Sequence, residues 1–204
     1  GGNYFYWDST STATDNGGSI IKPTSVGGAG RWISTESVFN PNMFGAKGDN
    51  NKDDTAYVIA TISATSTNGS VVGRQNSTYR ISTRVNLASK CIKDMVLSYS
   101  AGTASLVLSG NSKILNTTIY VNTTAPSFSS PLSGAVNLHL ADGVIIDGLY
   151  IPDGSANSGI RIGIFCSTEA NDVTVRNCKM DYIAWPLLYN DDTNFISRVV
   201  DGVD

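Results

Sequence analysis

A segment of eight residues occurs three times in the second half of the chain, and this repeat limits the folds that the chain can adopt. Residues 114–121, 144–151 and 173–180 align at successive offsets of 30 and 29, and an Asn- or Asp-containing turn precedes each one. Apolar residues at alternate positions are typical of half-buried strands. One such unit cannot bury its apolar face alone, so successive units must stack on one another. The repeat therefore predicts a solenoid of parallel strands.

In the second and third segments, the alternating apolar side chains are expected to point inward, with a bend between two inward pairs. These residues are Val144, Ile146, Leu149, Ile151, Val173, Val175, Cys178 and Met180. The first segment departs from the pattern, because Asn116 falls at a position that is expected to point inward. Either this is an inner Asn bonded to turn backbone, or the register differs by one residue there.

Residues 39–69 contain the one segment with a helical pattern. Asp53 or Asp54 is placed to cap the start of the helix, and Asn68-Gly69 stops it. Four residues with the i, i+3, i+4, i+7 spacing of one helical face follow the cap: Thr55, Val58, Ile59 and Ile62.

Residues 1–38 read differently from the rest of the chain. An aromatic strand at residues 4–7, a polar turn-rich stretch and short strands around residues 20–21 and 31–33 predict a small β-module. The expected architecture is all-β: a module at 1–38, then a parallel β-helix with one N-terminal capping helix at 39–204. With no polar cap before Asp204, the solenoid is expected to continue in a longer native chain.

The composition and charge of the chain exclude several classes of binding partner. Only 15% of the residues are charged, the net charge is −3 and the isoelectric point is about 5.0, so we expect no nucleic-acid partner and no anionic membrane surface. Every apolar stretch is shorter than a membrane-spanning helix requires, so no membrane insertion is expected. Cys91, Cys166 and Cys178 are too scattered for a disulfide framework or a zinc site and are predicted to be buried. We expect no metal and no cofactor.

Two motifs resemble known families. Residues 44–49, with the sequence FGAKGD, followed by 53–56, DDTA, resemble the opening signature of the pectate-lyase-like superfamily of right-handed β-helices, in which a helix then caps the first coil. The pattern of residues 6–18, 21–23 and 30–33 is similar to the short module ahead of the β-helix in many phage tailspikes. Together the two resemblances cover roughly residues 3–90.

The resemblance implies a component of a phage tailspike or tail fibre, located in the virion tail and extracellular. Members are typically homotrimers that attach to other tail or baseplate proteins and engage bacterial surface polysaccharide, either capsule or lipopolysaccharide. The alternative is an active polysaccharide depolymerase, hydrolase or lyase, whose site lies later in the β-helix or between subunits. A secreted pectinolytic enzyme is disfavoured by the N-terminal module.

The repeat places Asp147 and Arg176 at the same position of successive coils, about one strand spacing apart. An exposed ion pair is the simpler interpretation. The alternative is a sugar-binding or acid/base pair on an outer face, because a lyase needs a basic group beside a neutralised carboxylate.

Aromatic residues supply the other candidates. Tyr120 and Tyr150 are expected to stack outward with Lys179 as the next rung, where they would bind sugar rings, line a trimer interface or simply pack across strands. Later in the chain, carboxylates lie near two aromatic residues, a composition suited to a sugar site, although solvated turns explain them as well. These residues are Asp172, Asp181, Asp191 and Asp192, with Trp185 and Tyr189.

Overall fold

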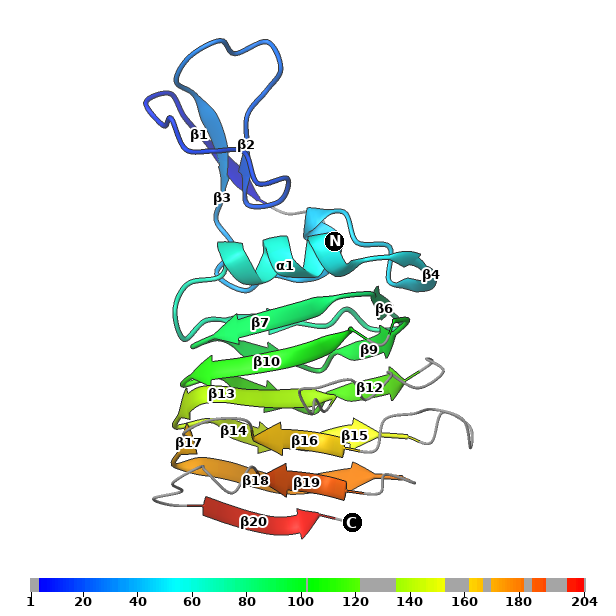
Figure 1. Cartoon of the computed structure of the whole chain (residues 1–204). Coiled ribbons are helices and arrows are strands. Elements are labelled where there is room, and N and C mark those ends of the chain that lie inside the picture. Colours follow the sequence, from blue (N-terminus) through cyan, green and yellow to red (C-terminus); the bar gives the residue numbers. More distant parts are fainter. Residues whose placement is uncertain are drawn as a thin grey trace.

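The computed structural model describes residues 4–101, 103–121, 135–152, 162–166, 170–181, 185–189 and 198–203. Within these ranges the protein is mostly β, with one α-helix and curled parallel sheets (Figure 1). The elements are β1 (Phe5–Asp8), β2 (Ile20–Ile21), β3 (Arg31–Ser34), the 3-10 helix η1 (Pro41–Phe44), β4 (Asp49–Asp53), α1 (Thr55–Ala64), β5 (Ser70–Val72), β6 (Thr78–Ile81), β7 (Arg84–Ala88), β8 (Cys91–Lys93), β9 (Val96–Tyr99), β10 (Ser105–Gly110), β11 (Lys113–Leu115), β12 (Thr118–Val121), β13 (Val136–Asp142), β14 (Ile145–Asp147), β15 (Tyr150–Ile151), β16 (Ile162–Cys166), β17 (Ala170–Asn171), β18 (Val173–Met180), β19 (Trp185–Tyr189) and β20 (Arg198–Val203).

The parallel strands form three ladders. The first contains β5, β8, β11, β14, the start of β18 and β20, and the second contains β4, β6, β9, β12, β15 and the end of β18. Because β18 pairs with both β14 and β15, these two ladders are one bent sheet of 11 strands. The third ladder is the six-stranded sheet β19-β16-β13-β10-β7, with β17 beside β13.

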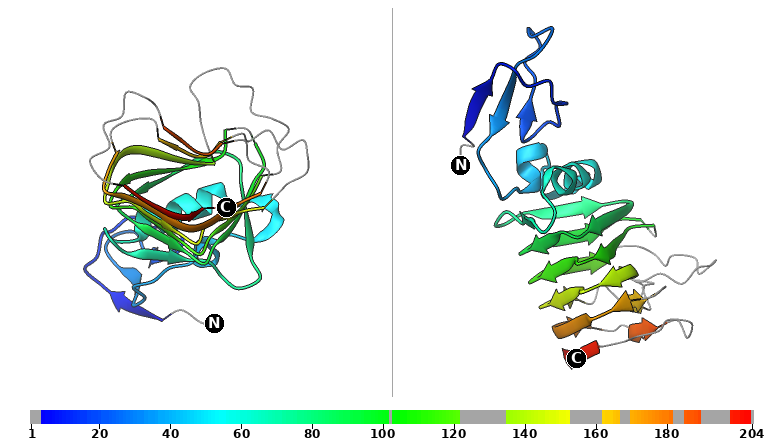
Figure 2. Two further views of the ribbon diagram at one scale, coloured as in Figure 1. Left: turned by 90° about the horizontal axis from the view of Figure 1, so that it is seen from below. Right: turned by 90° about the vertical axis from the view of Figure 1, so that its left-hand side faces the viewer.

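The chain visits the three ladders in a fixed order. From β5 it passes to β6 and β7, then returns to the first ladder at β8, where each residue pairs with one a turn earlier. One turn thus runs from Ser70 to its partner Cys91, and the next runs from Cys91 to its partner Lys113. Seen along the stack, the ladders lie around a common interior (Figure 2). This arrangement is compatible with the predicted β-helix.

The predicted register is right for the second and third repeat segments and wrong for the first. Ile145 pairs with Thr174, and these two residues are separated by the offset that the repeat predicted. Ile114, however, pairs with Ile146 rather than with Val144. A shift of two residues keeps every side chain on its own face, and apolar alternation alone therefore does not distinguish the two alignments.

The corrected register explains Asn116, which is exposed rather than inward. It lies at the corner between the first and second ladders, where one residue per turn has a positive φ: Asp94 (53°), Asn116 (46°), Gly148 (70°) and Asn177 (52°). Asn, Asp and Gly adopt this left-handed conformation most readily. The Asn116 Nδ2 also donates to the Asp94 Oδ1 of the preceding turn, at 3.3 Å. The corner residues therefore turn each strand in the same direction.

The interior is filled by columns of apolar side chains, one from each turn. In the first ladder the column consists of residues that are at most 1% exposed: Val71, Ile92, Ile114, Ile146 and Val175. Full burial of such a side chain contributes about 1.5–3 kcal/mol. All residues predicted to point inward at 144–151 and 173–180 are buried. Cys91, Cys166 and Cys178 are buried with free thiols, as predicted.

Two buried tyrosines belong to this core, and each hydroxyl finds an acceptor. The Tyr79 hydroxyl donates to Asn42 Oδ1 at 2.6 Å, which ties η1 to the second ladder. The Tyr99 hydroxyl donates to the carbonyl oxygen of Ala135 at 2.9 Å, and burial raises the pKa of Tyr99. Buried polar groups without partners are costly, so these bonds allow large aromatic residues to fill the interior.

Helix α1 lies across the end of the stack, beside η1 and β7 (Figure 1). Thr55, Val58 and Ile62 are buried as predicted, but Ile59 is 40% exposed, and Thr61 is buried instead. None of the helices in the described ranges is long and apolar enough to span a membrane.

Two neighbouring carboxylates fix the start of the helix in different ways. Asp53 Oδ1 accepts the backbone N–H of Thr55 at 3.0 Å. Asp54 is fully buried, makes no capping bond and accepts the backbone N–H groups of Lys47 and Gly48 at 2.7 and 2.9 Å. Asp54 therefore occupies the N-cap position and holds the preceding loop, while the Asp53 side chain bonds the first backbone N–H of the helix.

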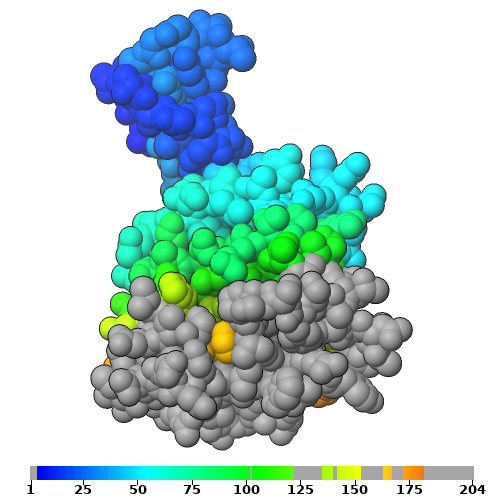
Figure 3. Space-filling model, viewed as in Figure 1, coloured from blue at the N-terminus to red at the C-terminus, as the bar shows by residue number. Residues whose placement is uncertain are grey.

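The N-terminal strands form a separate antiparallel sheet in the order β1-β3-β2, which stands out from the stack (Figure 3). Trp7 and Trp32 pair across it with ring centroids 5.3 Å apart, and each is 42% exposed. Among residues 4–38, none joins the hydrophobic core cluster. A Cβ atom on Gly18 would overlap the Phe44 ring, so the loop between β1 and β2 packs closely on η1 there.

We predict that Gly148→Ala destabilises the protein. The φ of 70° and an Asn116 Oδ1 that lies 2.7 Å from the new Cβ both oppose an L side chain, so the free energy of unfolding should fall by about 1–2 kcal/mol. Urea denaturation measures this change. Gly27→Ala, with no atom within 4 Å of its Cβ, is the control. Equal stability of the two variants would contradict the role of the corner.

Candidate functional site

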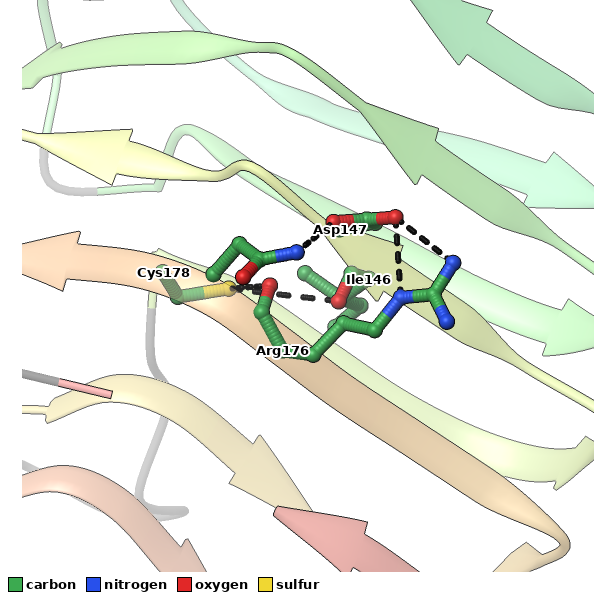
Figure 4. Close-up of polar contacts among 5 residues, drawn as sticks. Ile146, Asp147, Arg176 and Cys178 are labelled. Carbon is green, nitrogen blue, oxygen red and sulfur yellow. Dashed lines mark hydrogen bonds and ion pairs between the residues drawn. The ribbon is translucent and has the colours of Figure 1, made fainter. Parts of the chain in front are cut away.

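The corner between the first and second ladders brings together two of the predicted site residues. Asp147 at the end of β14 pairs in register with Arg176 in β18. The Arg176 Nε and its terminal nitrogen both bond the Asp147 Oδ2, at 2.9 and 2.8 Å (Figure 4). Asn177 Nδ2 donates to the other oxygen, Oδ1, at 2.9 Å. One carboxylate is therefore held by two neighbouring side chains of the next turn.

These contacts determine the protonation of Asp147. The hydrogen bonds from Asn177 and Arg176 hold the pKa of Asp147 below its usual value. The carboxylate is thus ionised at neutral pH, and it cannot donate a proton as a general acid. The Arg176 side chain is 52% exposed, and its remaining N–H groups can donate to a ligand.

A second cluster lies on the outer face of the second ladder. Tyr150 in β15 pairs in register with Lys179 in β18, as predicted, and the Lys179 Nζ lies 5.6 Å from the centre of the Tyr150 ring. Asp181 joins them: its Oδ2 accepts the Tyr150 hydroxyl at 3.0 Å, and its Oδ1 lies 3.4 Å from Lys179 Nζ. The hydrogen bond to Asp181 raises the pKa of Tyr150. An aromatic ring, an ammonium and a carboxylate thus lie side by side.

Tyr120 does not take the position that the repeat predicted. Thr118, rather than Tyr120, is the register partner of Tyr150, because the first repeat segment is shifted by two residues. Tyr120 itself is 40% exposed and pairs with Ser98. The two rings belong to one surface but do not stack as successive rungs.

For Trp185 and Tyr189, two of the remaining candidates, the structure describes only the backbone. Trp185 and Tyr189 lie in β19 of the third ladder, where the backbone pairs them with Ile162 and Cys166, and their side chains are outside the description. Asp191 and Asp192 lie outside the described residues. Of the predicted carboxylate cluster, the structure describes Asp172, which is exposed, and Asp181, which lies beside Tyr150.

Sequence reasoning missed Asn177, which bonds the carboxylate of the predicted pair. The repeat contained the signal that could have found Asn177. Asn177 follows Gly148 by the same number of residues by which Arg176 follows Asp147. Both Gly148 and Asn177 lie at the corner where Asn, Asp and Gly recur. Across the described part of the chain, no three His, Cys, Asp or Glu side chains converge as a metal site would require. The chemistry of this surface is hydrogen bonding, charge and ring stacking, which suits the recognition of hydroxyl-rich ligands.

No protein-family model matches the chain, and no curated protein matches its sequence. Among solved structures, the chain is similar to the tailspike protein gp49 from Acinetobacter baumannii bacteriophage Fri1, a capsular polysaccharide depolymerase. The TM-score is 0.51 and the identity 15%, over 98% of this chain and 48% of that chain. The fold is therefore tailspike-like, and the chain spans about half the length of that tailspike.

Two further similarities are weaker. A proposed glycosyl hydrolase from Parabacteroides merdae matches with a TM-score of 0.48 and 11% identity, over 82% of this chain and 95% of that one. The enzymatically active domain of tailspike protein 2 of bacteriophage CBA120 matches with a TM-score of 0.31 and 17% identity, over 95% of this chain and 35% of that one. Scores this low do not support a structural inference.

We predict that the Asp147–Arg176 pair adds little to stability. Arg176→Gln should lower the free energy of unfolding by less than about 1 kcal/mol, because the pair is exposed to solvent. Since the pKa of Asp147 is lowered in the folded state, its contribution is present above the unfolded pKa of about 3.9 and is lost as the pH falls through the lower folded value. Urea titrations of the wild type and Asp147→Asn between pH 7 and pH 2 should therefore converge on the acid side. A difference that does not shrink as the pH falls below about 3.9 would contradict this assignment.

Proposed function

We propose that this chain is part of a phage tailspike and that it engages polysaccharide on a bacterial surface. The observation that carries the proposal is the tailspike-like fold, because the similarity to gp49 extends over 98% of the chain and includes both the antiparallel sheet and the parallel ladders. A likeness at 15% identity concerns the fold alone, so the function rests on this likeness together with the surface chemistry of the corner.

In this proposal, residues 39–204 begin a right-handed parallel β-helix of the pectate-lyase-like type, and residues 1–38 are a neck module on the virion side. The exposed tryptophans Trp7 and Trp32 support such a module, because a small sheet without core residues gains stability by packing on other tail or baseplate proteins or on further subunits of a homotrimer. The location that follows is the virion tail, outside the bacterial cell.

The corner supplies the contacts that a sugar needs. The Tyr150 ring offers an apolar face for a sugar ring, while Lys179, Asp181 and Arg176 offer donors and an acceptor for hydroxyl groups. Bonds between these side chains preorganise the cluster, so binding immobilises few free rotamers. This argument favours recognition of glycan on the outer face of the described turns.

An active depolymerase is the alternative, and one contact favours it. A polysaccharide lyase needs a cation that neutralises the carboxylate of its substrate, and Arg176, which bonds Asp147 and has a side chain that is 52% exposed, offers one. The lowered pKa of Asp147 speaks against a hydrolase acid at this position, because that role needs a raised pKa. If the native protein cleaves its glycan by hydrolysis, the proposal places the catalytic carboxylates later in the β-helix or between subunits.

We predict that Tyr150→Ala weakens glycan binding about tenfold, because it removes both the ring and the hydroxyl that holds Asp181. A panel of capsular polysaccharides and lipopolysaccharides, immobilised and titrated with the chain, identifies a bound glycan and gives the affinity. Tyr57→Ala, which removes an exposed tyrosine of α1 away from the corner, is the control. An unchanged affinity in Tyr150→Ala would contradict the corner as the binding site, and no binding to any glycan would contradict the proposed function.

The same panel tests for cleavage. Release of reducing ends, with absorbance of unsaturated sugars, would indicate a lyase, and Arg176→Gln should then abolish it. Reducing ends without unsaturated products would indicate hydrolysis. Binding without either product is the result we expect from these turns.

A further inference from the structure

A hollow of about 270 Å³ opens at the other edge of the first ladder, where the chain enters it from the third ladder. Four successive turns contribute to its lining, and their strands β8, β11 and β14 pair in register. The lining residues are Asn68, Lys90, Cys91, Asn111, Lys113, Gly143 and Ile145. None of them belongs to the Tyr150 cluster.

Left-handed turns keep this hollow open. Asn68 and Gly143 lie at the corner with φ of 62° and 67°. A Cβ atom on Gly143 would overlap the Asn111 Oδ1, so the missing side chain lets the backbone of one turn approach the amide of the turn before it. The Cys91 side chain is only 6% exposed and lies at the base of the wall formed by β8.

The hollow is basic, although the whole chain has a net charge of −3. It is lined by two lysines and two asparagines, and no carboxylate is among its lining residues. Lys90 Nζ donates to the carbonyl oxygen of Ile62 in α1, which fixes its position. An ammonium has three donors, so Lys90 keeps two for a ligand. Lys113 is exposed, and its ammonium has no ion-pair or hydrogen-bond partner in the described part of the chain.

We propose that this hollow binds the carboxylate of an acidic sugar residue, so that the polysaccharide engaged by this face is acidic. The inference rests on the proposed function and deepens it. Two ammonium groups complement one carboxylate, the amides of Asn68 and Asn111 complement hydroxyl groups, and Ile145 offers an apolar wall. The volume lies just below the usual range of small-molecule sites, so one sugar residue rather than a longer segment fits it.

The position of the hollow extends the binding surface of the corner. Cys91, Lys113 and Ile145 occupy the first outward column of the first ladder, and Asp147 and Arg176 occupy the second, two residues further along the strands. That separation is about 7 Å along a strand. A glycan chain that places an acidic residue in the hollow can therefore continue along the same face toward Arg176.

The test uses a hyaluronan hexasaccharide, which carries glucuronate carboxylates, and the same hexasaccharide with its carboxylates methyl-esterified. Isothermal titration calorimetry with the full chain should give about tenfold tighter binding of the acidic form. Lys113→Gln should remove most of this preference and leave the affinity for the ester unchanged. Lys52→Gln makes the same charge change at an exposed lysine of β4 and should preserve the preference. Raising the salt concentration should weaken the binding of the acidic hexasaccharide but not that of the ester, because exposed charges are screened.

Lys90→Gln is the second variant, and a thermal unfolding curve shows whether it retains its fold without the bond to Ile62. Equal binding of both hexasaccharides, no binding of either, or an equal loss in Lys113→Gln and Lys52→Gln would overturn the inference. If inorganic phosphate displaces the hexasaccharide at the same concentration as sodium glucuronate, the hollow is a general anion site and the inference is also wrong.

The proposed function can survive that failure. If the two hexasaccharides bind equally, but a neutral glycan from the panel binds the wild type and loses affinity in Tyr150→Ala, glycan recognition is supported and only the acidic preference is refuted. If the whole panel and both hexasaccharides fail to bind, both proposals are refuted.

Discussion

Parallel pairing of each strand with the strand one turn later is the interaction on which the rest of this structure depends. The column from Val71 to Val175 is buried only because every member is covered by the turns above and below it. A slip of one residue would carry such a column to solvent, so burial fixes which face each residue occupies. No turn is stable alone, and the helix α1 closes the end at which the stack begins.

The corners between the ladders place polar side chains of successive turns next to one another on the surface. A residue with positive φ at the same place in each turn keeps the outward columns aligned, which brings Asp147 against Arg176 and Tyr150 against Lys179. Side chains that lie one full turn apart in the sequence thus meet with no loop to position them. Such preorganisation favours binding, because the side chains are already held by one another before a ligand arrives.

The charges are distributed unevenly over this surface. The chain is acidic overall, yet the hollow of the first ladder is lined by Lys90 and Lys113, and the single carboxylate of the Asp147 pair is already neutralised by Arg176. An exposed basic face on an acidic protein attracts anions over a range of about 8 Å at physiological salt. An acidic glycan would fit both the fold and this distribution of charge.

Four features could be predicted from the order of residues alone: the strand-rich parallel stack, the helix that begins at Thr55, the burial of the cysteines and the contact between Asp147 and Arg176. The register of the first repeat could not be predicted in this way, because a two-residue shift preserves alternation. The contact of Asp181 with Tyr150 and the hollow that four turns leave beside Lys113 became visible only in the folded chain. These features depend on the direction of each corner and on side chains from different turns, and apolar periodicity carries no information about either.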